Sequence, residues 1–270
     1  MSEVQEPVER SNSLLRAVRT DDRETADALW DRLAGSDSTT LAAALGDDDS
    51  RTAFWLNVYN AAVQDDLRDD PARYESRLRF FVADRVSVAG HELSLNDIEH
   101  GILRRSKSLF GLGYLSRLLP SGFERTHRVA EFDPRIHFAL NCGAASCPPV
   151  AAYSADRLDE ELTLASRSYL GTEVDYALDR GIVRVPQLFL WYYGDFGGRS
   201  GMLDLLRRYG DLPADAAPKI RYRSSDWSLD LENFLDFDRD PDAGDDADRA
   251  GVAGTTTPAG RDESSVEAGR

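Results

Sequence analysis

Cysteine is scarce in this chain of 270 residues, which contains only Cys142 and Cys147. Two cysteines are too few for the disulfide framework of a small secreted domain. The chain also lacks an apolar run of the roughly 20 residues that a membrane helix requires, and its charged first residues do not resemble a signal peptide. We therefore expect a cytoplasmic protein with free thiols and no membrane partner.

Lysine is almost absent as well, since Lys107 and Lys219 are the only two. The chain carries 48 acidic and 32 basic residues, a net charge of −16. Such a balance is typical of halophilic proteins, because molar salt shortens the Debye length to about 3 Å and screens surface repulsion. A generic acidic protein from a high-GC genome is the alternative. Either way, an acidic chain without a basic stripe argues against a nucleic-acid partner.

Helical and strand patterns alternate along the chain. Helices are expected over residues 11–48, 50–67 with Ser50 as cap, 94–106 with Ser94 as cap, 154–171 and 202–210. Strands are expected over 80–95 as a hairpin turning at 89–90, 135–141, 174–189 as a hairpin turning at 179–181, and 219–230.

These patterns predict an α+β fold, in which a helical N-terminal part packs on a small antiparallel sheet. Residues 1–50 would be a helical segment of the same domain as residues 51–237. Residues 238–270 contain almost no aromatic side chains and predict a disordered acidic tail.

The stretch "DPRIHFALNCGAASCPPV" contains both cysteines and one of the four histidines. If residues 135–141 form a strand, His137 and Asn141 lie on the polar face and Cys142 follows at its end. A thiol beside unpaired backbone N–H groups is a candidate nucleophile. Pro148 and its neighbour would place Cys147 on a rigid loop.

A base must lie about 3 Å from its nucleophile, which limits the pairing. An extended chain would separate His137 and Cys142 by about 16 Å. His137 would then serve Cys147 if the chain doubles back, and His100 would serve Cys142. The neighbouring Glu99 should not orient His100, because adjacent helical residues point about 100° apart.

Four blocks, "FWLNVYNA", "LSLNDIEHGILR", "DPRIHFALNCGAASCPP" and "FLWYYGDF", occur in this order and resemble the DUF547 family over residues 51–236. The resemblance includes Asn57, Tyr59, Asn60, Glu99, His100, His137, Cys142 and Pro148. Plant members often carry Ser at the position of Cys147, which implies that Cys142 is the functional thiol. The resemblance also implies a relation to papain-like or transglutaminase-like thiol enzymes and their fold.

Three functions follow from these residues. The first is a cysteine-dependent hydrolase or acyltransferase acting on an amide or thioester, with Cys142 as nucleophile, His100 or His137 as base, and Asn141 or local N–H groups at the oxyanion. The second is a non-catalytic binding or scaffold module, in which Asn57, Tyr59, Asn60 and Cys147 belong to a polar network. The third is a metal site of His137, Cys142, Cys147 and His100.

The first function is the prediction that we carry forward. It requires no cofactor and no metal, and its partner would be a small-molecule or peptide substrate. The sequence does not indicate an oligomeric state.

Overall fold

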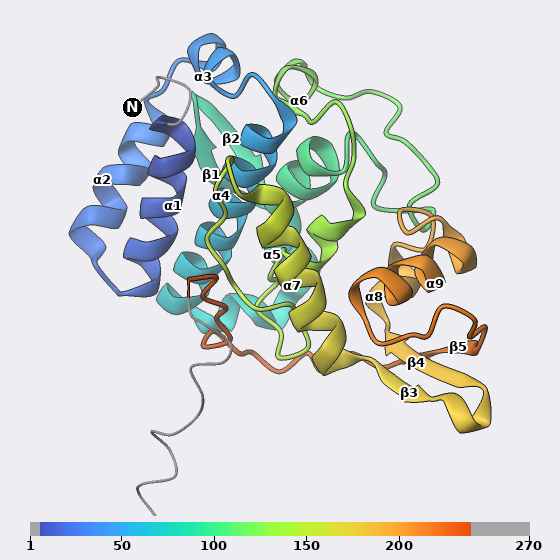
Figure 1. Ribbon diagram of the computed structural model, residues 1–270. Helices are drawn as coiled ribbons and strands as arrows, with labels where there is room; N and C mark the ends of the chain where they lie inside the picture. The colour runs from blue at the N-terminus through green and yellow to red at the C-terminus, as the bar shows by residue number, and fades with distance from the viewer. Residues whose placement is uncertain (1–5, 239–270) are drawn as a thin grey trace, which may run out of the picture. The chain divides into compact units, whose positions relative to one another are not determined.

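Helices dominate the first part of the computed structural model, which describes residues 6–238 (Figure 1). They are α1 (Glu6–Arg19), α2 (Arg23–Ala34), α3 (Ser38–Ala44) and α4 (Asp48–Asp69). Helix α1 packs along α4 and buries Leu14 and Leu15. Helix α4 begins one turn earlier than predicted, because Asp47 and not Ser50 caps it: Oδ1 of Asp47 accepts the backbone N–H of Ser50 at 2.7 Å.

Helix α4 is buried on all sides over most of its length, from Ala53 to Gln64. A helix without a polar face belongs in the centre of a domain, where its neighbours must satisfy its polar side chains. Asn57 and Asn60 are both fully buried on this helix. Their amides therefore have to bond to segments that pack against α4.

A hairpin follows the short helices η1 (Pro71–Ser76) and α5 (Arg77–Val82). Strands β1 (Asp84–Val88) and β2 (His91–Ser94) pair antiparallel. The predicted turn is confirmed, with Ala89 and Gly90 at φ of 51° and 74°. Positive φ at both central residues is the geometry that matches the twist of two hairpin strands.

The segment after β2 forms a π-helix, η2 (Asp97–Leu103), where an α-helix was expected. Its start follows the prediction: Ser94 Oγ accepts the N–H of Asp97 at 3.1 Å, and Asp97 accepts the N–H of Ser94 at 3.2 Å. Further along, the backbone bonds span five residues, as from the N–H of Arg104 to the carbonyl of Glu99.

The predicted strand at 135–141 is wrong, because residues Pro134–Phe138 form the 3₁₀ helix η3. Asp133 caps it by accepting the N–H of Arg135 at 2.8 Å, and Pro134 occupies the first helical position. Ile136, His137 and Phe138 are all buried, so the apolar alternation did not mark two faces of a strand. Helices α6 (Gly122–His127) and α7 (Leu158–Glu173) flank this region.

The C-terminal part contains β3 (Asp175–Ala177), η4 (Leu178–Arg180), β4 (Ile182–Pro186), α8 (Leu188–Trp191), α9 (Gly198–Tyr209) and β5 (Lys219–Arg223). The predicted turn ends at Gly181, with φ of 64°. Strand β4 pairs antiparallel with β3 but parallel with β5, so this sheet is mixed and not purely antiparallel as expected.

The α+β prediction is confirmed. Residues through Phe237 form one compact unit. The predicted disordered tail at 238–270 lies outside the described residues except for Asp238. None of the helices within residues 6–238 has the length and apolar character needed to cross a membrane.

Candidate functional site

A cavity of about 210 Å³ lies where η2, η3, α8 and the cysteine loop meet. Its wall contains six of the residues selected from the sequence, Tyr59, Glu99, His100, His137, Cys142 and Cys147. Trp191, Tyr192 and Trp227 add apolar surface. The fold therefore brings together two histidines, a carboxylate and both sulfur atoms from two separate parts of the chain.

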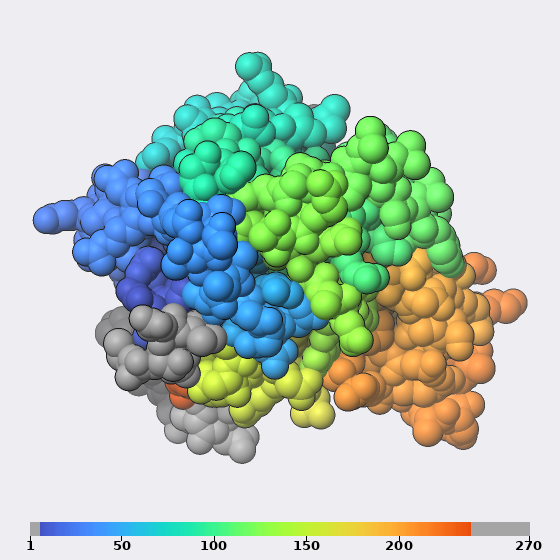
Figure 2. Space-filling view, turned by 90° about the horizontal axis from the view of Figure 1, so that it is seen from above, coloured from blue at the N-terminus to red at the C-terminus, as the bar shows by residue number. Residues whose placement is uncertain are grey.

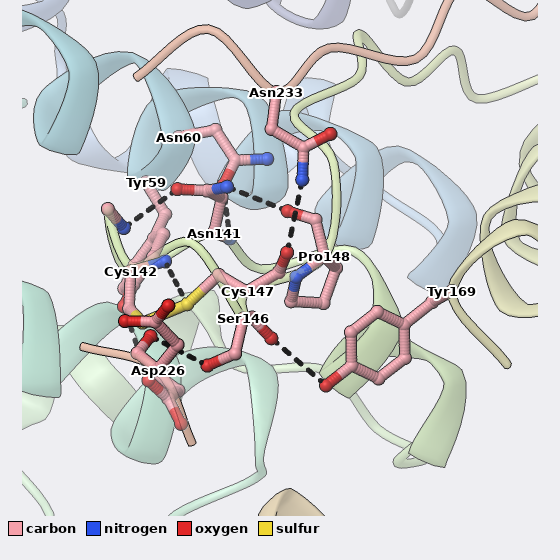
Figure 3. Close-up of a disulfide and its surroundings, with 12 residues drawn as sticks. Tyr59, Asn60, Asn141, Cys142, Ser146, Cys147, Pro148, Tyr169, Asp226 and Asn233 are labelled. Carbon is pink, nitrogen blue, oxygen red and sulfur yellow. Dashed lines mark hydrogen bonds between the residues drawn. A yellow bond between two sulfur atoms is a disulfide. The ribbon is translucent and has the colours of Figure 1, made fainter. Parts of the chain in front are cut away.

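Cys142 and Cys147 form a disulfide with Cα atoms 6.1 Å apart, which corrects the expectation of free thiols (Figure 3). The loop between them turns back on itself: Gly143 has a φ of 86°, and the N–H of Cys147 bonds the carbonyl of Ala144 at 2.9 Å. The N–H of Cys142 also donates to Sγ of Cys147 at 3.3 Å. This turn brings the two sulfur atoms into bonding contact.

Asn141 and Asn60 hold the start of this loop (Figure 3). Asn141 accepts the N–H of Gly143 and donates to the carbonyl of Pro148, both at 2.7 Å. Asn60 accepts the N–H of Asn141 and donates to the carbonyl of Ala139, both at 3.0 Å. Both amides are thus engaged with backbone groups, so the side chain of Asn141 is not placed to bind an oxyanion.

Asn57, one turn earlier on α4, makes an equivalent clamp on another segment. It accepts the N–H of Tyr153 and donates to its carbonyl, both at 2.8 Å. Its amide also donates to Oγ of Ser11 at 3.2 Å, which ties α1 to the same position. The two Asn residues of α4 therefore support neighbouring loops and do not line the cavity.

His137 is oriented by Asp195, a residue that the sequence analysis did not select. Nε2 of His137 lies 2.9 Å from Oδ2 of Asp195, and Nε of Arg104 donates to the same oxygen at 2.7 Å. All three side chains are at most 1% exposed. Burial acts to raise the pKa of Asp195, but the bonds from His137 and Arg104 outweigh it and lower the pKa.

The ionised Asp195 fixes the tautomer of His137. Nε2 must carry the hydrogen that the carboxylate accepts, which leaves a lone pair on Nδ1. No group within residues 6–238 hydrogen-bonds this Nδ1. Burial lowers the pKa of His137, although Asp195 opposes the shift, so the imidazole is neutral at pH 7. An imidazole that is held in this way can act as a general base.

His100 has the opposite tautomer. Nη1 of Arg104 donates to Nδ1 of His100 at 2.6 Å, so the hydrogen of this neutral ring is on Nε2. Burial, reinforced by the charge of Arg104, lowers the pKa of His100 to about 4. Oε1 of Glu99 lies 3.6 Å from Nδ1 of His100, closer than expected, because the π-helix changes the angle between adjacent residues.

Glu99 connects this group to Tyr192. The hydroxyl of Tyr192 donates to Oε1 at 2.6 Å, and that of Tyr59 reaches Oε2 at 3.4 Å. Burial acts to raise the pKa of Glu99, but His100, Arg104 and the Tyr192 hydroxyl lower it. The ring of Tyr192 also stacks on His137 with centroids 3.9 Å apart.

The sequence contained signals for the residues that were missed. Arg104 lies four positions after His100 in "DIEHGILRR", so a single helical turn brings them together. Tyr192 and Asp195 lie in "FLWYYGDF", the last of the four blocks that carry the family resemblance. Gly113 packs against Asp195 so closely that an added Cβ would lie 2.6 Å from its Oδ1.

Within the described part of the chain, no group of three or more His, Cys, Asp or Glu side chains is arranged to hold a metal ion. The set proposed from the sequence, with both cysteines and two histidines, is not such a group. Its two sulfur atoms are bonded to each other.

Residues 44–170 match a family model described as "Protein of unknown function, DUF547". This part of the chain therefore belongs to the DUF547 family. The DUF547 match includes Glu99, His100, Arg104, His137 and the cysteine loop, whereas Tyr192 and Asp195 come from beyond it. No curated protein and no solved structure matches the chain. The carboxylate that orients His137 thus comes from beyond the part of the chain that matches the family.

Proposed function

We propose that the reduced protein is a cysteine-dependent hydrolase or acyltransferase that acts on an amide or thioester. The observation that carries the proposal is the His137–Asp195 pair, which leaves a lone pair on Nδ1, together with the presence of His137 and Cys142 in the wall of one cavity. A neutral imidazole held by a buried carboxylate is the base that thiol and hydroxyl nucleophiles use. The relation to papain-like or transglutaminase-like enzymes belongs to this proposal.

In the proposed reaction, Nδ1 of His137 takes the proton of the Cys142 thiol as sulfur attacks the substrate carbonyl carbon. The carbonyl π pair moves to oxygen, and the tetrahedral adduct collapses when the protonated His137 gives its proton to the leaving amine or thiol. Water, or an acceptor nucleophile, then attacks the acyl-thioester with His137 again as base; the C–S bond breaks, and Cys142 takes the proton from His137 and returns to the thiol.

His100 supplies the donor for the developing oxyanion in this account. Its Nε2 carries a hydrogen because Arg104 occupies Nδ1, and its low pKa keeps the ring neutral at pH 7. A neutral histidine fixed in this way can polarise a carbonyl without acting as an acid. This assignment replaces Asn141, whose amide is engaged with Gly143 and Pro148.

The disulfide has to be reduced before Cys142 can react. An external dithiol such as dithiothreitol supplies the two electrons: its sulfur atoms form a cyclic disulfide while Cys142 and Cys147 each gain a proton. The cavity surface includes both cysteines, so a small dithiol has access to the bond.

Acylation by p-nitrophenyl acetate tests the proposal directly. Dithiothreitol-treated protein, freed of excess reductant, should release a burst of p-nitrophenol and retain an acetyl group on Cys142 in peptide mass spectra. Cys147→Ser is the matched variant that should retain the burst, whereas Cys142→Ser should lose it. A burst that survives in Cys142→Ser, or is absent from the reduced wild-type protein, contradicts the proposal.

A non-catalytic binding module is the second candidate, and the disulfide favours it. With Cys142 bonded to Cys147, the cavity contains no nucleophilic sulfur, while its walls and aromatic side chains remain in place. The amides of Asn57 and Asn60 have a structural role whether the protein is an enzyme or a binding module. This function is supported if a ligand of the cavity binds the oxidised and reduced proteins with equal affinity and neither form turns it over.

A further inference from the structure

Exposed apolar side chains concentrate in one segment, residues 105–121 between η2 and α6, which we name the apolar loop. Of the eleven large apolar side chains that are exposed in residues 6–238, seven lie here. Leu118 is 96% exposed, Leu119 92% and Phe110 75%. Such a concentration of exposed apolar side chains in one segment of a chain as acidic as this one indicates a binding surface.

Backbone hydrogen bonds hold the apolar loop together and attach it to the rest of the molecule. The N–H of Ser108 bonds the carbonyl of Leu115 at 2.8 Å, and that of Arg117 bonds the carbonyl of Ser106 at 2.7 Å. The N–H of Gly194 donates to the carbonyl of Leu112. In Figure 2 this part of the chain, in green, protrudes beside the orange C-terminal helices. Its leucines are therefore held outward by a defined backbone.

The charge of this region is opposite to that of the chain as a whole. Residues 105–128 contain five basic residues and one acidic residue, Glu124. Arg105 and Arg125 are exposed, and Lys107, one of the two lysines, donates to the carbonyl of Gly113 and not to an acid. Arg117 is the exception, since it pairs with Asp97 and Glu124. The apolar loop is thus flanked by cationic groups.

We propose that the apolar loop docks the protein onto an anionic lipid bilayer, with Leu118, Leu119 and Phe110 entering the interface. Leucine and phenylalanine bury their side chains at the acyl boundary, and arginine and lysine meet the anionic headgroups. The remaining acidic surface is repelled by such a bilayer, which fixes the orientation. The sequence-based expectation of no membrane partner was based on the lack of a membrane-spanning segment. The proposed docking does not require such a segment, because the side chains enter only the surface of the bilayer.

Docking in this orientation brings the cavity to the lipid surface. Leu109 belongs to the apolar loop and also lines the cavity. Gly113 of the same loop packs on Asp195, so the apolar loop is in direct contact with a residue of the site. The docking itself requires neither a free thiol nor turnover, so it can be tested independently of the proposed reaction.

Co-sedimentation with vesicles tests the proposal on the full chain. The wild-type protein should bind phosphatidylglycerol vesicles at low ionic strength, bind phosphatidylcholine vesicles far more weakly, and lose affinity as salt rises. A Leu118→Ser/Leu119→Ser variant should bind phosphatidylglycerol roughly 100-fold more weakly. Arg105→Gln and Arg125→Gln should each weaken binding about five-fold.

Leu78→Ser/Val82→Ser is the matched control, because these side chains are also exposed, at 71% and 49%, but lie on α5 outside the loop. This control should bind like the wild type, and thermal melts should show that all variants are folded. The proposal is overturned if phosphatidylglycerol is not bound, if control and loop variants bind alike, or if the loop leucines instead hold a lipid-free dimer that the loop variant dissociates.

Discussion

His137 donates the hydrogen on Nε2 to Oδ2 of Asp195 across 2.9 Å, although 58 positions separate the two residues in the chain. Arg104 donates to the same oxygen, so the carboxylate stays ionised in a fully buried position. A buried carboxylate with two donors fixes one tautomer and one ring orientation. The account of the site depends on this pair.

Asp195→Asn should weaken the base while retaining the shape of the site. The amide oxygen can take the place of Oδ2 and accept from both Arg104 and His137, but the neutral group no longer stabilises the imidazolium that forms when Nδ1 takes the thiol proton. The acylation rate of reduced protein by p-nitrophenyl acetate should fall by about 10² to 10⁴. Asp159→Asn makes the same change in a carboxylate whose side chain is 87% exposed, and should leave the rate unaltered. Equal rates for the two variants would refute the role of Asp195.

Asn60→Ala should destabilise the protein and also release the cysteine loop. It leaves the buried N–H of Asn141 and carbonyl of Ala139 without partners, at a cost of roughly 2 to 4 kcal/mol in unfolding free energy. Asn57→Ala is the matched control, since it removes the same kind of clamp from Tyr153. Denaturant melts should show similar losses, whereas only Asn60→Ala should change the rate at which dithiothreitol reduces the disulfide. Identical reduction rates for the two variants would show that Asn60 does not hold the cysteine loop in place.

Acid should destabilise the fold between pH 6.5 and 4 through its buried neutral histidines. Burial lowers the pKa of His127, like that of His100, to about 4, so the unfolded chain binds a proton in this range and the folded chain does not. Stability is then complete above about pH 6.5 and decreases as the pH falls toward 4. His127→Phe should reduce the loss measured between pH 7.5 and 4.5 by about 2 kcal/mol. A variant with the same pH slope as the wild type would contradict this assignment.

Gly113→Ala should disturb the site by displacing Asp195. The added Cβ would meet Asp195 at 2.6 Å, and the backbone at φ of +85° is unfavourable for alanine. We expect a lower melting temperature and a loss of p-nitrophenyl acetate acylation similar to that of Asp195→Asn. Gly122→Ala is the control, because nothing lies within 4 Å of its added Cβ. Normal acylation in Gly113→Ala would show that this contact can relax without displacing Asp195.

Local patterns predicted some of the local structure of this protein. The turn at Ala89–Gly90 and the bonds between Ser94 and Asp97 depend on a few neighbouring residues, and both are present. The strand at 135–141 failed for an equally local reason, since Asp133 and Pro134 start a 3₁₀ helix that the apolar alternation concealed. The separation of about 16 Å between His137 and Cys142 assumed an extended chain, and it does not apply to a segment that begins as a 3₁₀ helix.

The partners of the site residues could not be read from neighbouring positions. Asp195 reaches His137 only because α8 and the segment after it fold back over η3. The disulfide requires a turn at Gly143 that residue types alone do not specify. The π-helix, which brings Glu99 within 3.6 Å of Nδ1 of His100, differs from an α-helix in bonding that the apolar pattern does not encode.

The most direct test of the central claim is the pH dependence of alkylation of the reduced protein by iodoacetamide, with Cys142 and Cys147 quantified separately by peptide mass spectrometry. We predict that Cys142 reacts with a midpoint well below the value of about 8.5 for an ordinary thiol. His137→Gln should return that midpoint toward 8.5. A Cys142 that reacts only near pH 8.5, or that is unaffected by His137→Gln, would contradict the account.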